Sequence, residues 1–305
     1  MIHKSVLLNE VLEAFKDLDS GVFIDCTLGL AGHSKEILKQ HKNLTLIGID
    51  KDLQGINIAK ENLKNENLDS RVKILNGGFS EKINEAILDS KKVVGILADI
   101  GVSSLQFDDL DRGFSFNSNN LDMRMNTESN LNAETILKTY SEFELEKIFR
   151  EYGEIRESKK LARLIKNHKG EFSSAKDLSE FISKHIKGGK IHPATLVFQA
   201  LRIEVNDELG ELKRFLDNIE SNVDKLNGAI LAIISFHSLE DRIVKEKFKL
   251  WGKNCICDDL VMKCECGNNN SKGEVLTKKP IIPSEFEVKN NPRARSAKLR
   301  LFRFH

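Results

Sequence analysis

The sequence lacks long apolar runs, a secretory signal and a disulfide pattern. Its longest clean apolar stretch, Gly228–Phe236, has the length of a buried strand and is far too short to span a membrane. The opening segment MIHKSVLLNEVLEAF mixes charges into an amphipathic pattern, unlike a signal peptide. Four of the five cysteines cluster between Cys255 and Cys266, which does not indicate a disulfide framework in a chain without an export signal. We therefore expect a cytoplasmic protein with no membrane partner.

The sequence also lacks a strong excess of either charge. Its 47 Lys and Arg and 46 Asp and Glu residues leave a formal net charge of +1. This balance neither requires nor excludes a nucleic-acid partner, because an RNA-binding enzyme can concentrate its positive charge on one face. A chain of 305 residues holds one large domain or two moderate ones, and we find no internal repeats.

The pattern of apolar residues predicts an α/β fold. Nearly continuous apolar runs at residues 21–26, 44–50, 71–75 and 93–101 alternate with helical patterns, which is typical of a parallel sheet covered on both faces. After Ser104 this alternation gives way to a long polar loop and then to helical patterns up to Asn218. The sheet pattern resumes at Gly228–Phe236. We predict one sheet domain, residues 1–107 and 222–305, interrupted by a helical insertion, residues 108–221.

The loop after the first predicted strand is a candidate nucleotide site, because a parallel sheet binds ligands at the carboxyl ends of its strands. It contains Gly29 and Gly32 but not the G-x-G-x-x-G spacing of dinucleotide sites. A loop without a pyrophosphate to hold suits S-adenosylmethionine. Asp50 then accepts hydrogen bonds from both ribose hydroxyls, and Phe79 packs on the adenine. Alternatively, the glycines only form a turn, Phe79 is a core aromatic, and the ligand is nicotinamide or another nucleotide.

Asp99, at the end of the fourth predicted strand, is the candidate catalytic residue. Enzymes that methylate exocyclic amines often carry an acid or amide here, followed by two prolines and an aromatic residue. This chain has Gly101 and Ser103 nearby instead, so the match is partial. An acceptor at this position can align the poorly nucleophilic N4 of cytosine with a methyl donor. Covalent chemistry at cytosine C5 needs a thiol, and the sequence has no Pro-Cys motif.

Several longer motifs resemble the bacterial RsmH (MraW) family. They cover the chain in order: HKSVLLNEVL, DCTLGLAGHS, GVSSLQFDDLDRGFSF, LDMRM, HPATLVFQALRIEVNDEL, SFHSLEDRIVK and NPRARSAKLR. The resemblance implies a Rossmann-like class I S-adenosylmethionine-dependent methyltransferase sheet with an inserted helical substrate-recognition domain. It also implies methylation of N4 of one cytosine in the decoding centre of small-subunit (16S) ribosomal RNA.

The same resemblance implies a set of cofactor contacts that includes the residues chosen above. The implied contacts are Ala31, Gly32, His33, Asp50, Phe79, Asp99 and Gln106. Departures from the family pattern lie in loops: Ala31 replaces a common glycine, Leu105 replaces a common proline, and Asn117–Asn120 replaces a more usual Asp-Gly-Pro segment. They bear on loop geometry more than on the reaction.

Three polar residues of the long predicted helix that begins near Pro193 are candidates for the substrate site. Gln199, Arg202 and Asn206 lie on one stripe, which forms either a solvated face or an active-site wall. As a wall, Arg202 contacts phosphate or base and Asn206 reads a base edge. His237 follows a buried strand and is a second candidate to touch the target cytosine, while Ser238 with Asp241 is expected to cap the next helix.

Two further groups of residues have two interpretations each. Lys298 and Arg300 share a face of the closing strand, where they either protect a sheet edge or contact phosphate. Arg293 and Arg295 lie in the loop before this strand and are the better candidates for phosphate contacts. Cys255, Cys257, Cys264 and Cys266 form C-x-C-x6-C-x-C, in which four thiolates can hold zinc, but the spacing is not the usual C-x2-C knuckle. The sequence leaves this metal site open.

The motifs and the resemblance together predict an S-adenosylmethionine-dependent RNA methyltransferase whose partner is 16S ribosomal RNA in the small ribosomal subunit. The alternatives are a DNA amino-methyltransferase, a non-catalytic ribosome-assembly RNA-binding protein, and an NAD-dependent oxidoreductase. Formation of a homodimer is left open.

Overall fold

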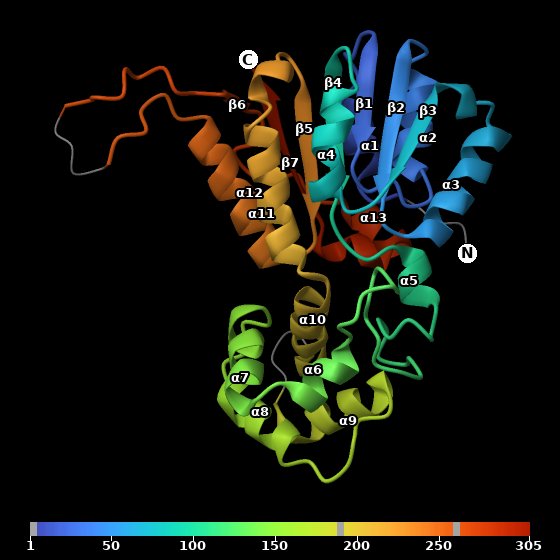
Figure 1. The fold of residues 1–305 in the computed structure, drawn as a ribbon, viewed down its shortest axis with the longest axis vertical. Helices are drawn as coiled ribbons and strands as arrows, with labels where there is room; N and C mark the ends of the chain where they lie inside the picture. The colour runs from blue at the N-terminus through green and yellow to red at the C-terminus, as the bar shows by residue number, and fades with distance from the viewer. Residues whose placement is uncertain (1–4, 188–191, 259–262) are drawn as a thin grey trace. The chain divides into compact units, whose positions relative to one another are not determined.

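The computed structural model describes residues 5–187, 192–258 and 263–305, which form two compact units (Figure 1). The sheet unit contains residues 1–101 and 211–305, and the helical unit contains residues 102–210. The α/β prediction is confirmed. No helix in the described part of the chain is long and apolar enough to cross a membrane.

A mixed sheet is the centre of the sheet unit. Its strand order is β3-β2-β1-β4-β5-β7-β6, with β7 antiparallel to β5 and β6 antiparallel to β7. The strands are β1 (Gly21–Asp25), β2 (Leu44–Asp50), β3 (Val72–Asn76), β4 (Val93–Asp99), β5 (Ile230–Ser235), β6 (Gly273–Val275) and β7 (Lys298–Phe304). The short β6 was not predicted, because three residues carry no detectable alternation.

Helices lie on both sides of this sheet and in the helical unit. Those of the sheet unit are α1 (Leu8–Ala14), α2 (Gly32–Gln40), α3 (Leu53–Asn65), α4 (Phe79–Leu88), α12 (Ser238–Trp251) and α13 (Glu285–Asn290), with short 3₁₀ turns η1 (Asp69–Arg71), η2 (Val223–Lys225) and η3 (Pro292–Ser296). Those of the helical unit are α5 (Ser104–Asp108), α6 (Ala133–Thr139), α7 (Glu142–Glu151), α8 (Ser158–Lys166), α9 (Ala175–His185) and α10 (Pro193–Asn206). The helix α11 (Glu208–Glu220) begins at the boundary of the two units and continues into the sheet unit.

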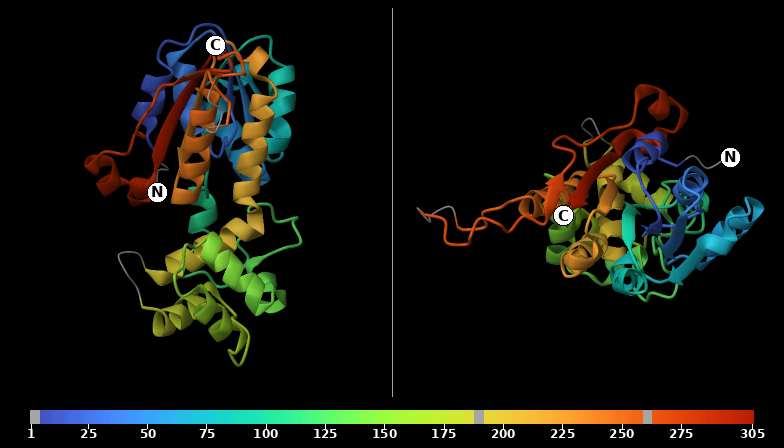
Figure 2. Two further views of the ribbon diagram at one scale, coloured as in Figure 1. Left: turned by 90° about the vertical axis from the view of Figure 1, so that its left-hand side faces the viewer. Right: turned by 90° about the horizontal axis from the view of Figure 1, so that it is seen from above.

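Each face of the sheet has its own apolar core, because successive side chains of a strand point to opposite faces. One core joins Ile24, Ile96 and Ile233 to side chains of α4, α11 and α12. The other joins Phe23 and Leu97 to side chains of α1, α2 and α3. The ribbon views show these helices on the two sides of the sheet (Figures 1 and 2).

The boundaries of the units differ from the predicted ones. The chain leaves the sheet unit after Gly101 and re-enters it at Glu211, whereas we predicted boundaries at 107/108 and 221/222. The reason lies in α11, whose apolar residues Leu212, Phe215, Leu216 and Ile219 are buried in the core of the sheet unit. The helical pattern continues across this boundary, so periodicity alone assigned α11 to the insertion.

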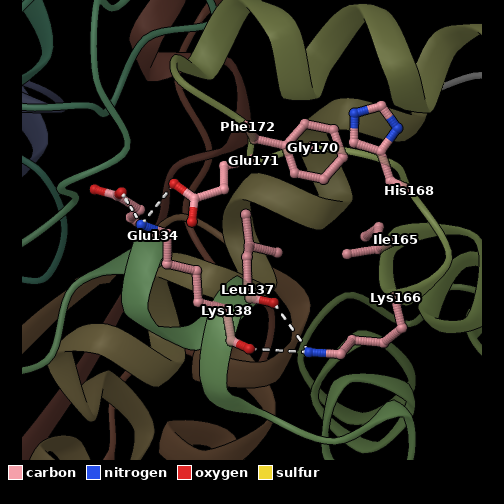
Figure 3. A pocket seen from close by; sticks show the side chains of 9 residues that line it. All are labelled: Glu134, Leu137, Lys138, Ile165, Lys166, His168, Gly170, Glu171 and Phe172. Atoms are coloured by element: carbon pink, nitrogen blue, oxygen red, sulfur yellow. Dashed lines mark hydrogen bonds and ion pairs between the residues drawn. The ribbon is translucent and has the colours of Figure 1, made fainter.

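The helical unit has its own apolar core and a small hollow. The hollow has a volume of about 310 Å³ and is lined by residues of α6, α8 and the turn that follows α8 (Figure 3). Its two lysines are already engaged: Lys166 donates to the carbonyls of Leu137 and Lys138, and Lys138 pairs with Glu134 and Glu171. We therefore assign this hollow no anionic ligand.

Candidate active site

Three carboxylates stand at the carboxyl ends of neighbouring strands. Asp25, Asp50 and Asp99 end β1, β2 and β4, and these strands are adjacent in the order β2-β1-β4. Burial raises the pKa of all three carboxyls above the usual range, and the charge of Asp25 adds to the increase at Asp50 and Asp99. Such a group of perturbed acids at the ligand-binding edge of a sheet is typical of a functional site.

Asp50 closes the loop that follows β1. The backbone N–H of Gly29 donates to Asp50 Oδ2 at 2.7 Å, and the backbone N–H of Asp52 donates to Oδ1 at 2.8 Å. Each carboxylate oxygen therefore keeps one lone-pair direction for a further donor. This arrangement suits a ligand with two adjacent hydroxyl groups.

The loop between β1 and α2 turns through left-handed backbone conformations. Gly29 has φ +52° and Ala31 has φ 62°. A left-handed residue with a side chain is strained, so Ala31 holds a backbone conformation that glycine adopts more readily. The turn brings the amino end of α2, Gly32 and His33, back over the end of β1.

His33 lies beside the carboxylate of Asp99. Its Nε2 lies 2.8 Å from the carbonyl oxygen of Val6, and its Nδ1 lies 3.8 Å from Asp99 Oδ2. Because a carbonyl only accepts, Nε2 carries a hydrogen, and Nδ1 of the neutral ring is an acceptor. The ring is thus fixed with one nitrogen facing Asp99.

Asp99 has one oxygen that is not satisfied. Within the described residues, Oδ1 is buried and has no hydrogen-bond partner, although the side chain as a whole is 24% exposed. Burial raises the pKa of Asp99 to about 6, and the nearby His33 limits this increase. A buried carboxylate oxygen without a donor is costly, so this atom indicates the place of a ligand hydrogen.

Asp25 supports the site and was not predicted as a site residue. Its Oδ2 accepts from the hydroxyl of Ser34 at 2.5 Å, and its Oδ1 accepts from the backbone N–H of Thr27 at 3.1 Å. The hydroxyl of Thr27 in turn accepts from the backbone N–H of Asp99 at 2.7 Å. The signal was present in the sequence, because the first apolar run ends in an acid just as the second and fourth do.

Comparison with known proteins assigns the chain to a family. A family model described as the MraW methylase family matches residues 1–305. The chain belongs to this family. It is 57% identical to ribosomal RNA small subunit methyltransferase H of Helicobacter pylori (strain B38), with 99% of this chain and 97% of that protein covered. The protein of the same name from Aliarcobacter butzleri (strain RM4018) is 55% identical, with 99% and 98% covered.

The resemblance to the RsmH (MraW) family is therefore confirmed. Among solved structures, a rRNA methylase from Streptococcus thermophilus aligns with a TM-score of 0.40 and 10% identity, covering 100% of this chain and 98% of that one.

Phe79 has a packing role in this methylase. It begins α4, is 9% exposed, and meets Phe215 edge-to-face with ring centroids 5.2 Å apart. Most of the Phe79 side chain is therefore buried in the apolar core, as expected if this residue is a core aromatic. Next to it, Glu211 pairs with Lys51 at 3.2 Å and lies so close to Gly78 that a Cβ there would meet Glu211 Oε1 at 2.6 Å. Lys51 and Glu211 were not predicted as site residues.

The other implied cofactor residue, Gln106, lies in the helical unit. The side-chain Oε1 of Gln106 accepts from the backbone N–H of Ser103 at 3.2 Å, and the backbone N–H of Gln106 donates to the hydroxyl of Ser103 at 3.2 Å. This reciprocal pair starts α5 in the manner of a capping box.

Arg202 and Asn206 of α10 are engaged inside the helical unit. Arg202 forms a two-pronged pair with Glu208 at 2.8 and 2.9 Å. Asn206 accepts from the backbone N–H of Met125 at 2.7 Å and donates to the carbonyl of Met123 at 2.8 Å. Asn206 thus holds the polar loop on both sides of Arg124, and its amide hydrogens face backbone. Their neighbour Gln199 donates to the carbonyl of Tyr152 at 2.8 Å.

His237 is the N-cap of α12, one residue earlier than predicted. The expected cap by Ser238 and Asp241 is wrong, because Ser238 is the first helical residue and the box is made by His237 and Glu240. The fully buried Glu240 accepts from the backbone N–H of Phe236 at 2.8 Å and approaches His237 Nε2 at 3.0 Å. His237 therefore stands at the end of β5, and its Nδ1 accepts from the backbone N–H of Glu240 at 3.5 Å.

Asp241 instead anchors two basic residues of β7. Lys298 Nζ lies 3.2 Å and Arg300 Nε lies 2.6 Å from its carboxylate. Neither proposed role of this face applies to Arg300, which is 6% exposed on a strand that lies between β5 and β6 and not at an edge. Arg293 and Arg295 are exposed on η3.

Proposed function

We propose that this protein is a cytoplasmic enzyme that transfers a methyl group from S-adenosylmethionine to N4 of a cytosine in the decoding centre of small-subunit (16S) ribosomal RNA. The observation that carries this proposal is the buried, unsatisfied Oδ1 of Asp99 at the carboxyl end of β4. Membership of the MraW methylase family supports methyl transfer, and the names of the relatives support the RNA substrate.

The carboxyl edge of the sheet fits S-adenosylmethionine. Asp50 keeps one free lone-pair direction on each oxygen for the two ribose hydroxyls, and the Gly29–Ala31 turn presents backbone to the methionine part. His33 and Asp99 lie beside this turn, and Phe79, which begins α4 and is mostly buried against Phe215, is the residue expected to pack on the adenine. When bound, the cofactor supplies a methyl group on a positively charged sulfur.

Asp99 orients the amine and receives its proton. The N4 lone pair of cytosine is delocalised into the ring, so an acceptor that holds an N–H favours the pyramidal nitrogen that attacks the methyl carbon. After methylation the nitrogen is positively charged and must release one proton. Oδ1 of Asp99 is the acceptor for the N–H and then for this proton, because a pKa of about 6 leaves it ionised at neutral pH.

His33 provides the next acceptor for that proton. Its Nδ1 faces Asp99 at 3.8 Å, and its Nε2–H is committed to the carbonyl of Val6. The Nδ1 lone pair of His33 thus offers a site to which the proton can pass from Asp99.

The substrate side involves the helical unit and the exposed basic turn. The exposed residues Arg293 and Arg295 on η3 are the candidates for phosphate contacts, which position RNA without reading its sequence. Asn206 shapes the polar loop by its contacts with Met123 and Met125. Arg202, which pairs with Glu208, remains a candidate to contact phosphate or base, and His237 is the candidate to touch the base. The target cytosine must leave its stack, which costs a few kcal/mol and favours a distorted or single-stranded site.

The experiment is methyl transfer from labelled S-adenosylmethionine to intact small subunits, free ribosomal RNA and duplex DNA, followed by identification of the modified nucleoside. We expect N4-methylcytidine in small-subunit RNA and no label with Asp99→Ala. Preferential labelling of duplex DNA would favour a DNA amino-methyltransferase. An Asp99→Ala strain that retains the cellular role would favour a non-catalytic assembly protein. The absence of label in every RNA would overturn the proposal.

A further inference from the structure

A long irregular segment projects from the sheet unit between α12 and β6 (Figure 1). We call its described residues, 252–258 and 263–272, the cysteine loop. Its base is closed by the backbone N–H of Lys272, which donates to the carbonyl of Trp251 at 2.7 Å, and by that of Asn270, which donates to Asn254 at 3.0 Å. None of the described residues of the cysteine loop is buried, and its Ile256 is 52% exposed. A segment of this kind needs another source of order.

The four cysteines of the loop meet at one point. The Sγ atom of Cys264 lies 3.6 Å from those of Cys255 and Cys266, and the Sγ atoms of Cys255 and Cys266 lie 3.8 Å apart. With Cys257, all four sulfur atoms lie within 4.8 Å of one another. The two C-x-C arms thus face each other, although neither arm alone has the spacing of a usual zinc knuckle.

These distances match a tetrahedral metal site. Four thiolates at about 2.3 Å from one zinc ion stand roughly 3.8 Å apart along each edge of the tetrahedron. A disulfide requires about 2.05 Å between sulfur atoms, and all five cysteines are free thiols here. The sulfur atoms have therefore converged on a common centre without forming paired bonds.

Backbone donors also point at the sulfur atoms. The N–H of Ile256 donates to Cys266 Sγ at 3.4 Å, and the N–H of Glu265 donates to Cys257 Sγ at 3.3 Å. Each donor belongs to one arm and each acceptor to the other, so the arms are joined in both directions. Hydrogen bonds to the ligand atoms orient and stabilise thiolates in metal sites.

We propose that Cys255, Cys257, Cys264 and Cys266 bind one structural Zn²⁺ ion as four thiolates. On binding, each thiol releases its proton to solvent, and no oxidation state changes. Four protein ligands complete the tetrahedron and leave no open position for water or substrate, so the site orders the loop and takes no part in methyl transfer. The metal supplies the cross-link that an apolar core would supply elsewhere.

The test is metal analysis of the full-length protein, purified under reducing conditions, and titration of the metal-free form with Zn²⁺ or Co²⁺. We expect about one equivalent per chain, and for Co²⁺ the absorption of a tetrahedral tetrathiolate complex. Cys255→Ser and Cys264→Ser should lose this binding. Cys26→Ala, which changes the buried cysteine of the sheet core, should retain it.

A second readout separates local order from global folding. Zinc should slow proteolytic cleavage within residues 252–272 at least tenfold in the wild-type protein, while Cys255→Ser gains no protection from zinc. Titration of the wild-type chain alone keeps the test valid if a variant does not fold. Less than a tenth of an equivalent of zinc before and after reconstitution, iron in its place, or disulfide-bonded cysteine pairs in the reduced preparation would each overturn the zinc assignment.

Discussion

Asp99, the proposed catalytic residue, lowers the stability of the folded protein. Its pKa lies at about 6 in the folded protein against an ordinary value of 3.8, so the folded state holds the proton more tightly than the unfolded chain. Stability therefore falls as pH rises from about 4 to about 6 and stays lowered above that range. Asp99→Asn should slow methyl transfer, because the amide oxygen accepts the N–H but not the proton, and yet raise the free energy of unfolding at pH 7 by about 1–2 kcal/mol, discounted for the partial exposure of the side chain.

Urea unfolding at two pH values checks this prediction. The gain of Asp99→Asn should be present at pH 7 and absent below about pH 4, where the wild-type carboxyl is also neutral. A variant that is destabilised at pH 7 would show that the Asp99 carboxylate has a stabilising partner in the native protein.

His33 should set the acid limb of the reaction. Because a protonated His33 lowers the pKa of Asp99, whereas the neutral ring does not, His33→Ala should move the acid limb of kcat/KM to higher pH and reduce the rate at neutral pH about tenfold. His33→Gln, which offers a donor to the carbonyl of Val6, tests whether orientation alone restores the rate. An unchanged pH profile in His33→Ala would argue against any coupling of the two side chains.

Single residues show what the sequence can and cannot reveal about the site. Asp50 and Asp99 could be chosen as candidate site residues because each ends an apolar run, and parallel strands have their carboxyl ends at one edge of the sheet. The bond of His33 to Val6, and the route from Asp25 through Thr27 to Asp99, depend on packing between distant segments. No local pattern encodes such contacts.

The contact between α12 and β7 should depend on one carboxylate. Asp241 neutralises Arg300, which is buried, whereas its other partner Lys298 is 36% exposed. Asp241→Ala leaves a buried guanidinium unpaired and should cost about 3 kcal/mol of unfolding free energy. Lys298→Ala removes a solvated partner of the same carboxylate and should cost less than about 1 kcal/mol. Equal losses in urea unfolding would contradict this assignment.

The sequence predicted which segments form helices and strands, but not how these elements are arranged in the fold. The periodicity identified the strands before β6 and the closing strand, but it carried no information on strand order, so β7 was considered as an edge. It also assigned α11 to the insertion, because a helix looks the same on either side of a boundary. The cap of α12 was displaced by one residue, since Ser238 with Asp241 and His237 with Glu240 both have capping spacing.

We expect the helical unit to affect the reaction with RNA and the sheet unit to bind the cofactor. Asn206 holds the loop around Arg124 within the helical unit, whereas Asp50 belongs to the sheet unit. Asn206→Ala leaves two backbone groups without this partner and should lower kcat/KM for small-subunit RNA about tenfold, while the Kd for S-adenosylmethionine changes less than about twofold. Asn167→Ala, on the exposed end of α8, is the matched control and should change neither quantity. A large loss of cofactor affinity in Asn206→Ala would refute this division.

The strand order also fixes a sequence of events in time. Among the described residues, β6 pairs with β7, and β7 pairs with β5, although β6 is made before β7. β6 therefore cannot join the sheet until residues 298–304 have been synthesised, roughly a few seconds later at ordinary translation rates. The contacts that close the base of the cysteine loop, to Trp251 and Asn254, do not involve β7 and can form earlier. The four thiols can therefore meet a metal ion before the sheet is complete.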